Sequence, residues 1–195
     1  MNKSHYSIII FLGITLSSCI TVPAPKSGFM GDYSKLTGNK QGDELSFKDG
    51  IVKYATFDGV FINKPEISCL ECNSIELAEL QVALVSALEK EFSKKNKILK
   101  LNTTNALTLR TKIVNVETAN VPLNIISSII LFPLSHGGAS IEGEVINNNT
   151  QSVVAALSYA GKGNFITDTF SPLFKFGQAK DKIKTFSFEM AKLIN

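Results

Sequence analysis

The chain has 195 residues and a formal net charge of +3, and 19% of its residues are charged. The sequence contains no dense block of lysine and arginine, which argues against nucleic acid as a partner. The length suits one domain with a hydrophobic core, and no internal repeat is visible.

The first residues have the features of an export signal. Lys3 precedes a continuous apolar run over residues 8–16, and the run ends in the letters LSSC, residues 16–19. A charged start, a short apolar core and a small-residue exit are typical of a secretory signal peptide. The run is far shorter than the ~20 apolar residues needed to span a bilayer. The sequence therefore predicts a signal peptide over residues 1–18.

The LSSC motif resembles the bacterial lipobox, in which the cysteine thiol receives a diacylglycerol and the peptidase cuts before the cysteine. The resemblance predicts that Cys19 is lipidated and that its acyl chains anchor the protein to a membrane. Ile20 stands where an aspartate would retain an enteric lipoprotein at the inner membrane. By this resemblance we expect the outer membrane, with the protein facing the periplasm. The alternative is an uncleaved apolar tail with a chance cysteine.

Residues 20–28 contain two prolines and no periodicity, which predicts a tether. Nine extended residues reach about 30 Å at most, so the domain should stay close to the membrane surface. The next stretch, SGFMGDYSKL, offers Phe29, Asp32 and Tyr33 as residues that dock this segment on the domain.

Residues 37–50 are polar and rich in glycine, and we expect a loop there. The predicted organisation is thus a lipidated cysteine, tether and docking segment over residues 19–50, followed by a single domain over residues 51–195.

Within that domain the apolar pattern changes between strand and helix periods. In the strand at 139–147, Ile141 and Val145 should face the core while Glu142 and Glu144 face out. Asn73 and Glu76 fit a helix N-cap with its reciprocal partner. The pattern predicts strands over 54–63, 97–101, 106–117, 139–147 and 153–161, and helices over about 74–95 and 177–194.

This order predicts an α/β fold of the α+β-like kind, with a mixed, largely antiparallel sheet of about five strands. Two amphipathic helices should pack on one face of the sheet.

Cys69 and Cys72 remain as a pair once Cys19 carries lipid. An even number of cysteines in an oxidising compartment predicts a local disulfide. A zinc site would need four ligands, and only His136 remains as an obvious third, so we expect no metal. A thiol redox role for the pair is the alternative.

Motifs that would indicate catalysis are absent from the sequence: we find no GxSxG, HExxH, P-loop or GxGxxG. Glu142 and Glu144 could form an acid/base pair, but surface glutamates on a half-buried strand are the commoner explanation. We therefore expect no enzyme and no cofactor, with an unrecognised catalytic site as the alternative.

The stretch VPLNIISSIILFPLS, residues 121–135, is unusually apolar for a connection between strands. Helical spacing would place Ile125, Ile129 and Phe132 on one side. Broad apolar surfaces of this kind mark contacts with partners or membranes. The alternative is that one face packs on the sheet as part of the core.

Three features together resemble a family of bacterial lipoproteins known as domain of unknown function number thirty-three thirteen. They are the lipobox, the segment SGFMGDYSKL, and the stretch GGASIEGEVINNNTQSVVAALSYAGKG. Members carry a G-F-L-x-D-Y-S-x-L segment, in which Met30 here takes the leucine place. They also carry a G-A-x-x-E-x-E strand. The Cys69/Cys72 pair and the stretch FINKPEI depart from the family pattern.

The family's role is unassigned, so the resemblance implies location and fold more than activity. The interpretation that follows is a non-catalytic lipoprotein of the outer membrane. It would bind an envelope protein or a lipid.

Overall fold

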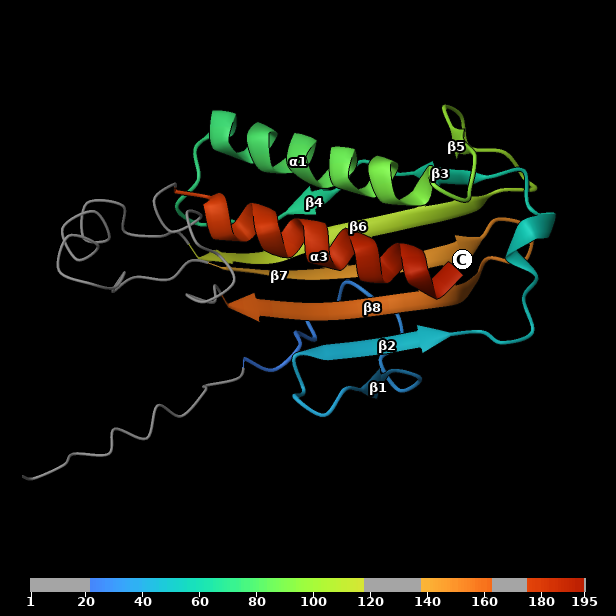
Figure 1. Cartoon of the computed structure of the whole chain (residues 1–195), viewed down its shortest axis with the longest axis horizontal. Coiled ribbons are helices and arrows are strands. Elements are labelled where there is room, and N and C mark those ends of the chain that lie inside the picture. The colour runs from blue at the N-terminus through green and yellow to red at the C-terminus, as the bar shows by residue number, and fades with distance from the viewer. Residues whose placement is uncertain (1–21, 118–137, 163–174, 195) are drawn as a thin grey trace, which may run out of the picture.

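Most of the short strands precede the long helices and strands along the chain (Figure 1), and this computed structural model describes residues 22–117, 138–162 and 175–194. The helices are α1 (Ser74–Phe92) and α3 (Gly177–Ile194), with a 3-10 turn at Tyr54–Thr56. The strands are β1 (Thr37–Gly38), β2 (Glu44–Lys48), β3 (Val60–Ile62), β4 (Glu66–Ile67), β5 (Ile98–Leu99), β6 (Leu107–Glu117), β7 (Gly138–Asn147) and β8 (Ser152–Lys162).

One mixed sheet joins the eight strands of the described ranges in the order β1-β2-β8-β7-β6-β3-β5, and β4 also pairs with β6. The strands from β1 through β8 and β7 to β6 pair antiparallel, whereas β3, β4 and β5 pair parallel. The mixed, largely antiparallel sheet agrees with the prediction. The expected number of about five strands was too low.

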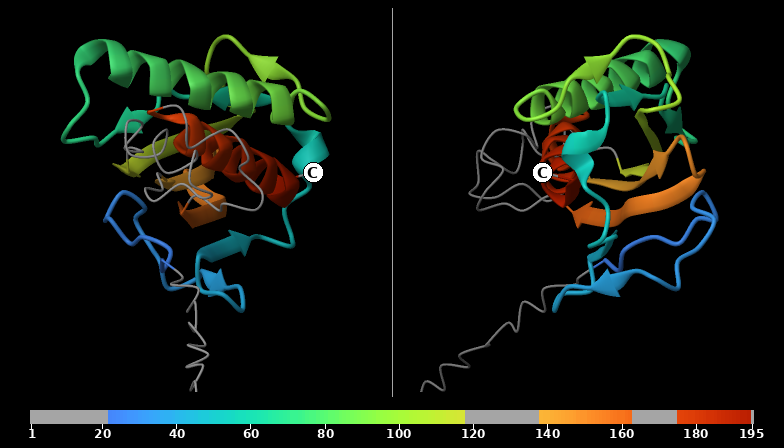
Figure 2. Two further views of the ribbon diagram at one scale, coloured as in Figure 1. Left: turned by 60° about the vertical axis from the view of Figure 1, so that its left-hand side comes forward. Right: turned by 90° about the vertical axis from the view of Figure 1, so that its right-hand side faces the viewer.

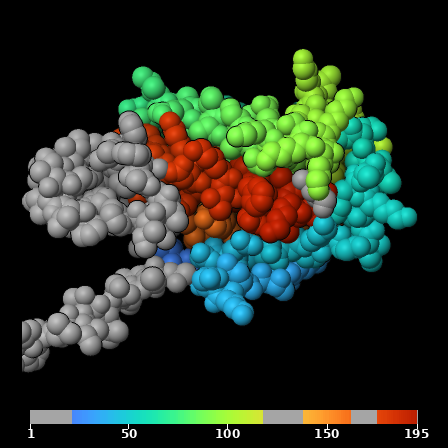
Figure 3. Space-filling view, in the orientation of Figure 1, coloured from blue at the N-terminus to red at the C-terminus, as the bar shows by residue number. Residues whose placement is uncertain are grey.

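Both helices lie on the same face of the sheet, as predicted (Figures 1 and 2), and Figure 3 shows them side by side over it. α1 packs against β3 and β4, and α3 packs against β7 and β8. The face turned away from the helices is called the outer face below. It carries the N-terminal segment, as the side views show.

The helices form where the sequence places apolar residues at intervals of three and four. α1 buries Leu80, Leu84, Leu88 and Phe92, which share one face of the helix. Full burial of each such side chain contributes about 1.5–3 kcal/mol. These residues meet the inner face of the sheet and the buried residues Ile183, Phe186 and Met190 of α3 in one core.

The predicted strand over 54–63 was too long. Its first part is the 3-10 turn, and only Val60–Ile62 is extended in the sheet. Gly59 lies between the two parts with φ of 150°, a backbone conformation that residues with a side chain rarely adopt. The strand therefore begins only after this glycine.

The predicted loop over 37–50 was wrong, because it contains β1 and β2. Leu45 and Phe47 alternate with polar residues in β2, which is a strand pattern. β2 pairs with β8 along its whole length. The sheet therefore begins at Thr37, ahead of the domain boundary expected at residue 51.

Candidate functional site

The segment that follows the predicted lipidation site crosses the outer face of the sheet. We call residues 22–34 the docked segment. Val22 lies beside Asn115 and Glu117, at the end of β6, and beside Ala139 at the start of β7. Next, the backbone N–H of Ala24 donates to Gly42 O (2.9 Å), and Pro25 O accepts from Ser158 Oγ (2.5 Å). The segment thus begins at one end of the strands and runs along the outer face toward the middle of the sheet.

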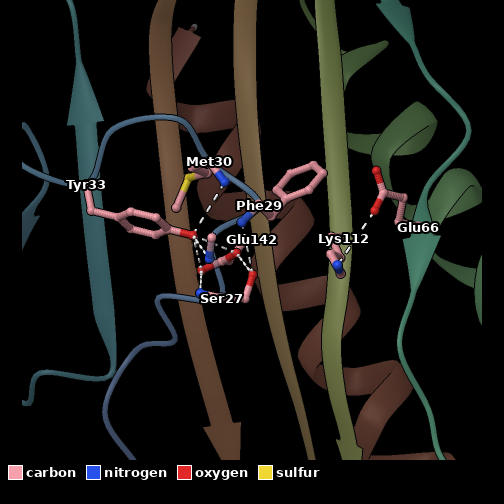
Figure 4. Close-up of polar contacts among 8 residues, drawn as sticks. Ser27, Phe29, Met30, Tyr33, Glu66, Lys112 and Glu142 are labelled. Carbon is pink, nitrogen blue, oxygen red and sulfur yellow. Dashed lines mark hydrogen bonds and ion pairs between the residues drawn. The ribbon is translucent and has the colours of Figure 1, made fainter.

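Glu142, on β7, is the main attachment point of the docked segment (Figure 4). Glu142 is fully buried, with 0% of its surface exposed. Ser27 donates to the carboxylate through both its backbone N–H (N to Oε1, 3.0 Å) and its hydroxyl. Tyr33 Oη lies 3.0 and 3.1 Å from the two carboxylate oxygens. Three donors from the docked segment therefore satisfy one buried carboxylate.

Tyr33 also orders the segment's own backbone. Its Oη accepts from the N–H groups of Gly28 (2.9 Å) and Met30 (3.3 Å). Gly28 has φ of 85°, which bends the chain around the hydroxyl without side-chain strain. Met30 is 3% exposed, so the bend also buries an apolar side chain.

A second carboxylate, that of Glu144, lies two residues further along β7 on the same face of the strand. Glu144 is 4% exposed, and its Oε1 lies 3.1 Å from Nη1 of Arg110 on β6. The guanidinium in turn lies 5.2 Å from the centroid of the Phe29 ring, a cation–π contact. Burial raises the pKa of Glu144, with Arg110 opposing the shift and Glu142 adding to it.

The expectation that Glu142 and Glu144 are surface glutamates is thus corrected. They do point away from the core side chains Ile141 and Val145, as the alternation predicts, but both are buried. The docked segment contacts Glu142 directly, and Phe29 lies over the partner of Glu144.

Of the three residues expected to dock the segment, the structure places Tyr33 and Phe29 against residues of the sheet. Asp32 instead accepts a hydrogen bond from the backbone N–H of Ser34 (2.8 Å), and hydrogen bonding to Ser34 lowers the pKa of Asp32. It shapes the turn after the docked segment and lies exposed.

Sequence reasoning missed the residues that receive the segment: Arg110, Glu142 and Ser158. Their only signal was position, because all three stand on the polar side of an alternating strand. A polar residue on that side is usually solvated, and nothing local distinguishes one that another part of the chain covers. Ser27 and Met30 lie within the segment SGFMGDYSKL but were not predicted to dock it.

Cys69 and Cys72 are joined by a disulfide, with Cα atoms 5.5 Å apart. The bridge closes the turn just before α1. Asn73 caps the helix: its side chain accepts from the N–H groups of Ile75 and Glu76 (3.0 Å each). Glu76 completes the capping box by accepting from the Asn73 N–H (3.0 Å).

The remaining predicted residues lie outside the described ranges. These are Cys19, His136 and the apolar residues Ile125, Ile129 and Phe132. Within the described ranges, no group of three or more His, Cys, Asp or Glu side chains is placed to hold a metal ion. Neither described helix is long and apolar enough to cross a membrane.

The family model for proteins of unknown function designated DUF3313 matches residues 25–190, which bears out the resemblance seen in the sequence. None of the curated protein sequences matches the chain.

Among solved structures, the PelC dodecamer from Paraburkholderia phytofirmans is similar, with a TM-score of 0.49 and 9% identity over 75% of this chain and 97% of that chain. Protein XCC0632 from Xanthomonas campestris, of the family DUF330, has a TM-score of 0.41 and 13% identity over 74% and 87% of the two chains. At these values the similarities carry no information on the activity of this chain.

Proposed function

The chain belongs to the DUF3313 family of proteins of unknown function, and from that membership we propose that it is a lipid-anchored, non-catalytic binding module of the bacterial envelope. Cys19 carries the lipid, the outer membrane holds it, and the domain faces the periplasm. Its partner is another envelope protein or a lipid.

The observation that carries this proposal is the position of the docked segment. Residue 22, three residues after Cys19, already lies against the strand ends, and Ala24 is hydrogen-bonded to the domain. Five extended residues from Cys19 to Ala24 reach about 18 Å at most. A lipid on Cys19 would therefore hold the folded domain at the membrane surface on a tether shorter than the one expected from the sequence.

The contacts of the polar side chains support a structural role for the site. Glu142 accepts from Ser27 and Tyr33, and Glu144 is paired with Arg110. A general base needs a free lone pair within reach of a substrate proton. Here the two buried carboxylates are engaged by protein groups, and the segment that covers them belongs to the same chain.

The anchor is tested by labelling cells with radioactive palmitate. Cys19→Ser should abolish incorporation into the protein and leave an unprocessed precursor. Cys69→Ser is the matched control, because it removes a cysteine but leaves the lipobox intact, and it should be labelled normally. Normal labelling of the Cys19→Ser protein would exclude the lipoprotein assignment.

The partner is tested by crosslinking in intact cells, followed by identification of what the wild-type protein captures. A partner that is captured equally by a secreted, lipid-free form would bind the domain without needing the membrane. Capture that requires the lipid would place the partner at the membrane surface.

A further inference from the structure

We propose that the end of the domain where the docked segment begins lies against the bilayer, with Leu70 and Ile75 contacting the lipid headgroup region. This inference rests on the lipid anchor of the proposed function. It adds an orientation and a contact surface that the anchor alone does not define.

The entry point of the docked segment and the disulfide turn lie at the same end of the strands. Val22 lies beside Asn115 and Glu117, in the last three residues of β6. β4 runs parallel to β6, with Ile67 opposite Ile113, so the turn that begins at Cys69 continues toward the same end. The starts of α1 and α3 are also joined to each other there, through an ion pair between Glu76 and Lys175 (2.5 Å).

Two apolar side chains project from this end. Leu70 is fully exposed and lies between the two cysteines of the disulfide, and Ile75 is 79% exposed in the first turn of α1. The disulfide and the capping box hold the backbone at both positions. Ordering these residues at a membrane would therefore cost little conformational entropy.

Exposure by itself does not select this end, because single exposed apolar residues are normal on protein surfaces. Leu101 is 77% exposed, and Ile51 is 90% exposed. Both lie toward the opposite end of the sheet, where β6 begins and β8 begins. The short tether from Cys19 to the docked segment determines which of the two ends faces the membrane.

The distances favour the end with Leu70. The five residues from Cys19 to Ala24 allow about 18 Å at most, whereas the eleven residues of β6 extend for about 33 Å. If the end of the domain near Val22 faces the membrane, Leu70 and Ile75 reach the bilayer and Leu101 stays away from it. Since the lipid already holds the domain at the surface, weak apolar contacts are enough to fix its orientation.

The sequence has no tryptophan, so one introduced residue becomes the only strong reporter. Leu70→Trp and Leu101→Trp form a matched pair: each replaces an exposed leucine, one at each end. Each full-length protein is expressed, processed and lipidated in cells, then reconstituted into vesicles of phosphatidylethanolamine and phosphatidylglycerol. Some of the lipids carry brominated acyl chains, which quench tryptophan at the depth of an interfacial residue, ~5–10 Å into the boundary.

We expect the Leu70→Trp protein to show blue-shifted emission and several-fold stronger quenching than the Leu101→Trp protein. Ile75→Trp serves as a second reporter at the same end and should behave like Leu70→Trp. Equal quenching of the Leu70→Trp and Leu101→Trp proteins would mean that the domain lies flat. Quenching of the Leu101→Trp protein alone, or of none of the three, would also overturn the orientation.

Failure of the anchor itself gives a different result. A protein without lipid would not float with the vesicles in a density gradient, whatever its fluorescence. That outcome overturns the proposed function and the orientation with it. Flotation without quenching at Leu70→Trp and Ile75→Trp overturns the orientation alone.

Discussion

Tyr33→Phe should loosen the docked segment while the core stays folded. The substitution removes only the hydroxyl, which donates to the buried Glu142 carboxylate and accepts from the backbone N–H groups of Gly28 and Met30. Hydrogen bonds to charged groups contribute about 1.5–3 kcal/mol. Ser27 still donates to Glu142, so the carboxylate keeps some of its partners. We therefore expect the segment to be destabilised by about 2 kcal/mol, near the lower part of that range.

The assay is limited trypsin digestion of the chain lacking residues 1–19, because Lys26 lies inside the docked segment and Lys35 just after it. When opening and closing are fast, cleavage follows the population of the open form. A change of about 2 kcal/mol raises that population up to ~30-fold. Cleavage at Lys26 should accelerate by about that factor, and far-UV circular dichroism should be unchanged.

Asp32→Asn is the matched control in the same segment. Asp32 accepts a hydrogen bond from the Ser34 N–H within its own turn, so its replacement should change cleavage at Lys26 little. A double-mutant cycle with Glu142→Gln should show coupling between positions 33 and 142. If Tyr33→Phe leaves cleavage at the wild-type rate, the hydroxyl does not hold the segment and the account of the site is refuted.

Three further predictions concern the domain itself. Gly143→Ala should cost about 1–3 kcal/mol in urea unfolding, since its Cβ would lie 2.9 Å from Phe186 Cζ and 3.1 Å from Thr111 Cγ2; Gly31→Ala, with open space around it, is the control. Replacing both Cys69 and Cys72 by serine should cost only about 2 kcal/mol, because the closed loop is short, and a failure to fold would contradict this. The folded-state pKa of Glu144 is raised above 4.5, so its contribution favours folding below that pH and is lost as the pH rises through the folded-state pKa. The stability advantage of the wild type over Glu144→Gln should therefore shrink from pH 4.5 to neutrality, and an advantage that grows with pH would contradict the sign.

The long elements of the fold could be predicted from the sequence because their patterns are local. The spacing of Leu80, Leu84, Leu88 and Phe92 is enough to define α1, and the box formed by Asn73 and Glu76 marks its start. The strands observed as β6, β7 and β8 differ from their predicted ranges by one residue at each end at most. In each case several consecutive residues carry the signal.

The short strands β1, β2 and β4 were not predicted in this way. β1 and β4 have two residues each, too few to show any period, and they are strands only because a longer neighbour pairs with them. β5, also of two residues, lies within the strand predicted over 97–101. β2 did carry a signal in Leu45 and Phe47, but the strand is short, and Gly42 and Gly50 on either side of it favoured a loop. Tertiary pairing defines these elements, and a local pattern contains no information on it.

The candidate site shows the same limit in a different form. Alternation along β7 correctly assigns Glu142 to the side away from the helices. Whether that side is exposed to solvent depends on the docked segment, which lies more than one hundred residues earlier in the chain. Without that segment, Glu142 would lose its hydrogen bonds from Ser27 and Tyr33. A buried carboxylate without partners is costly, so either water enters this face or the segment stays. Glu142, which the sequence pattern assigns to the surface, therefore favours the attached state of the docked segment. A lipid on Cys19 would then be connected through this segment to the sheet.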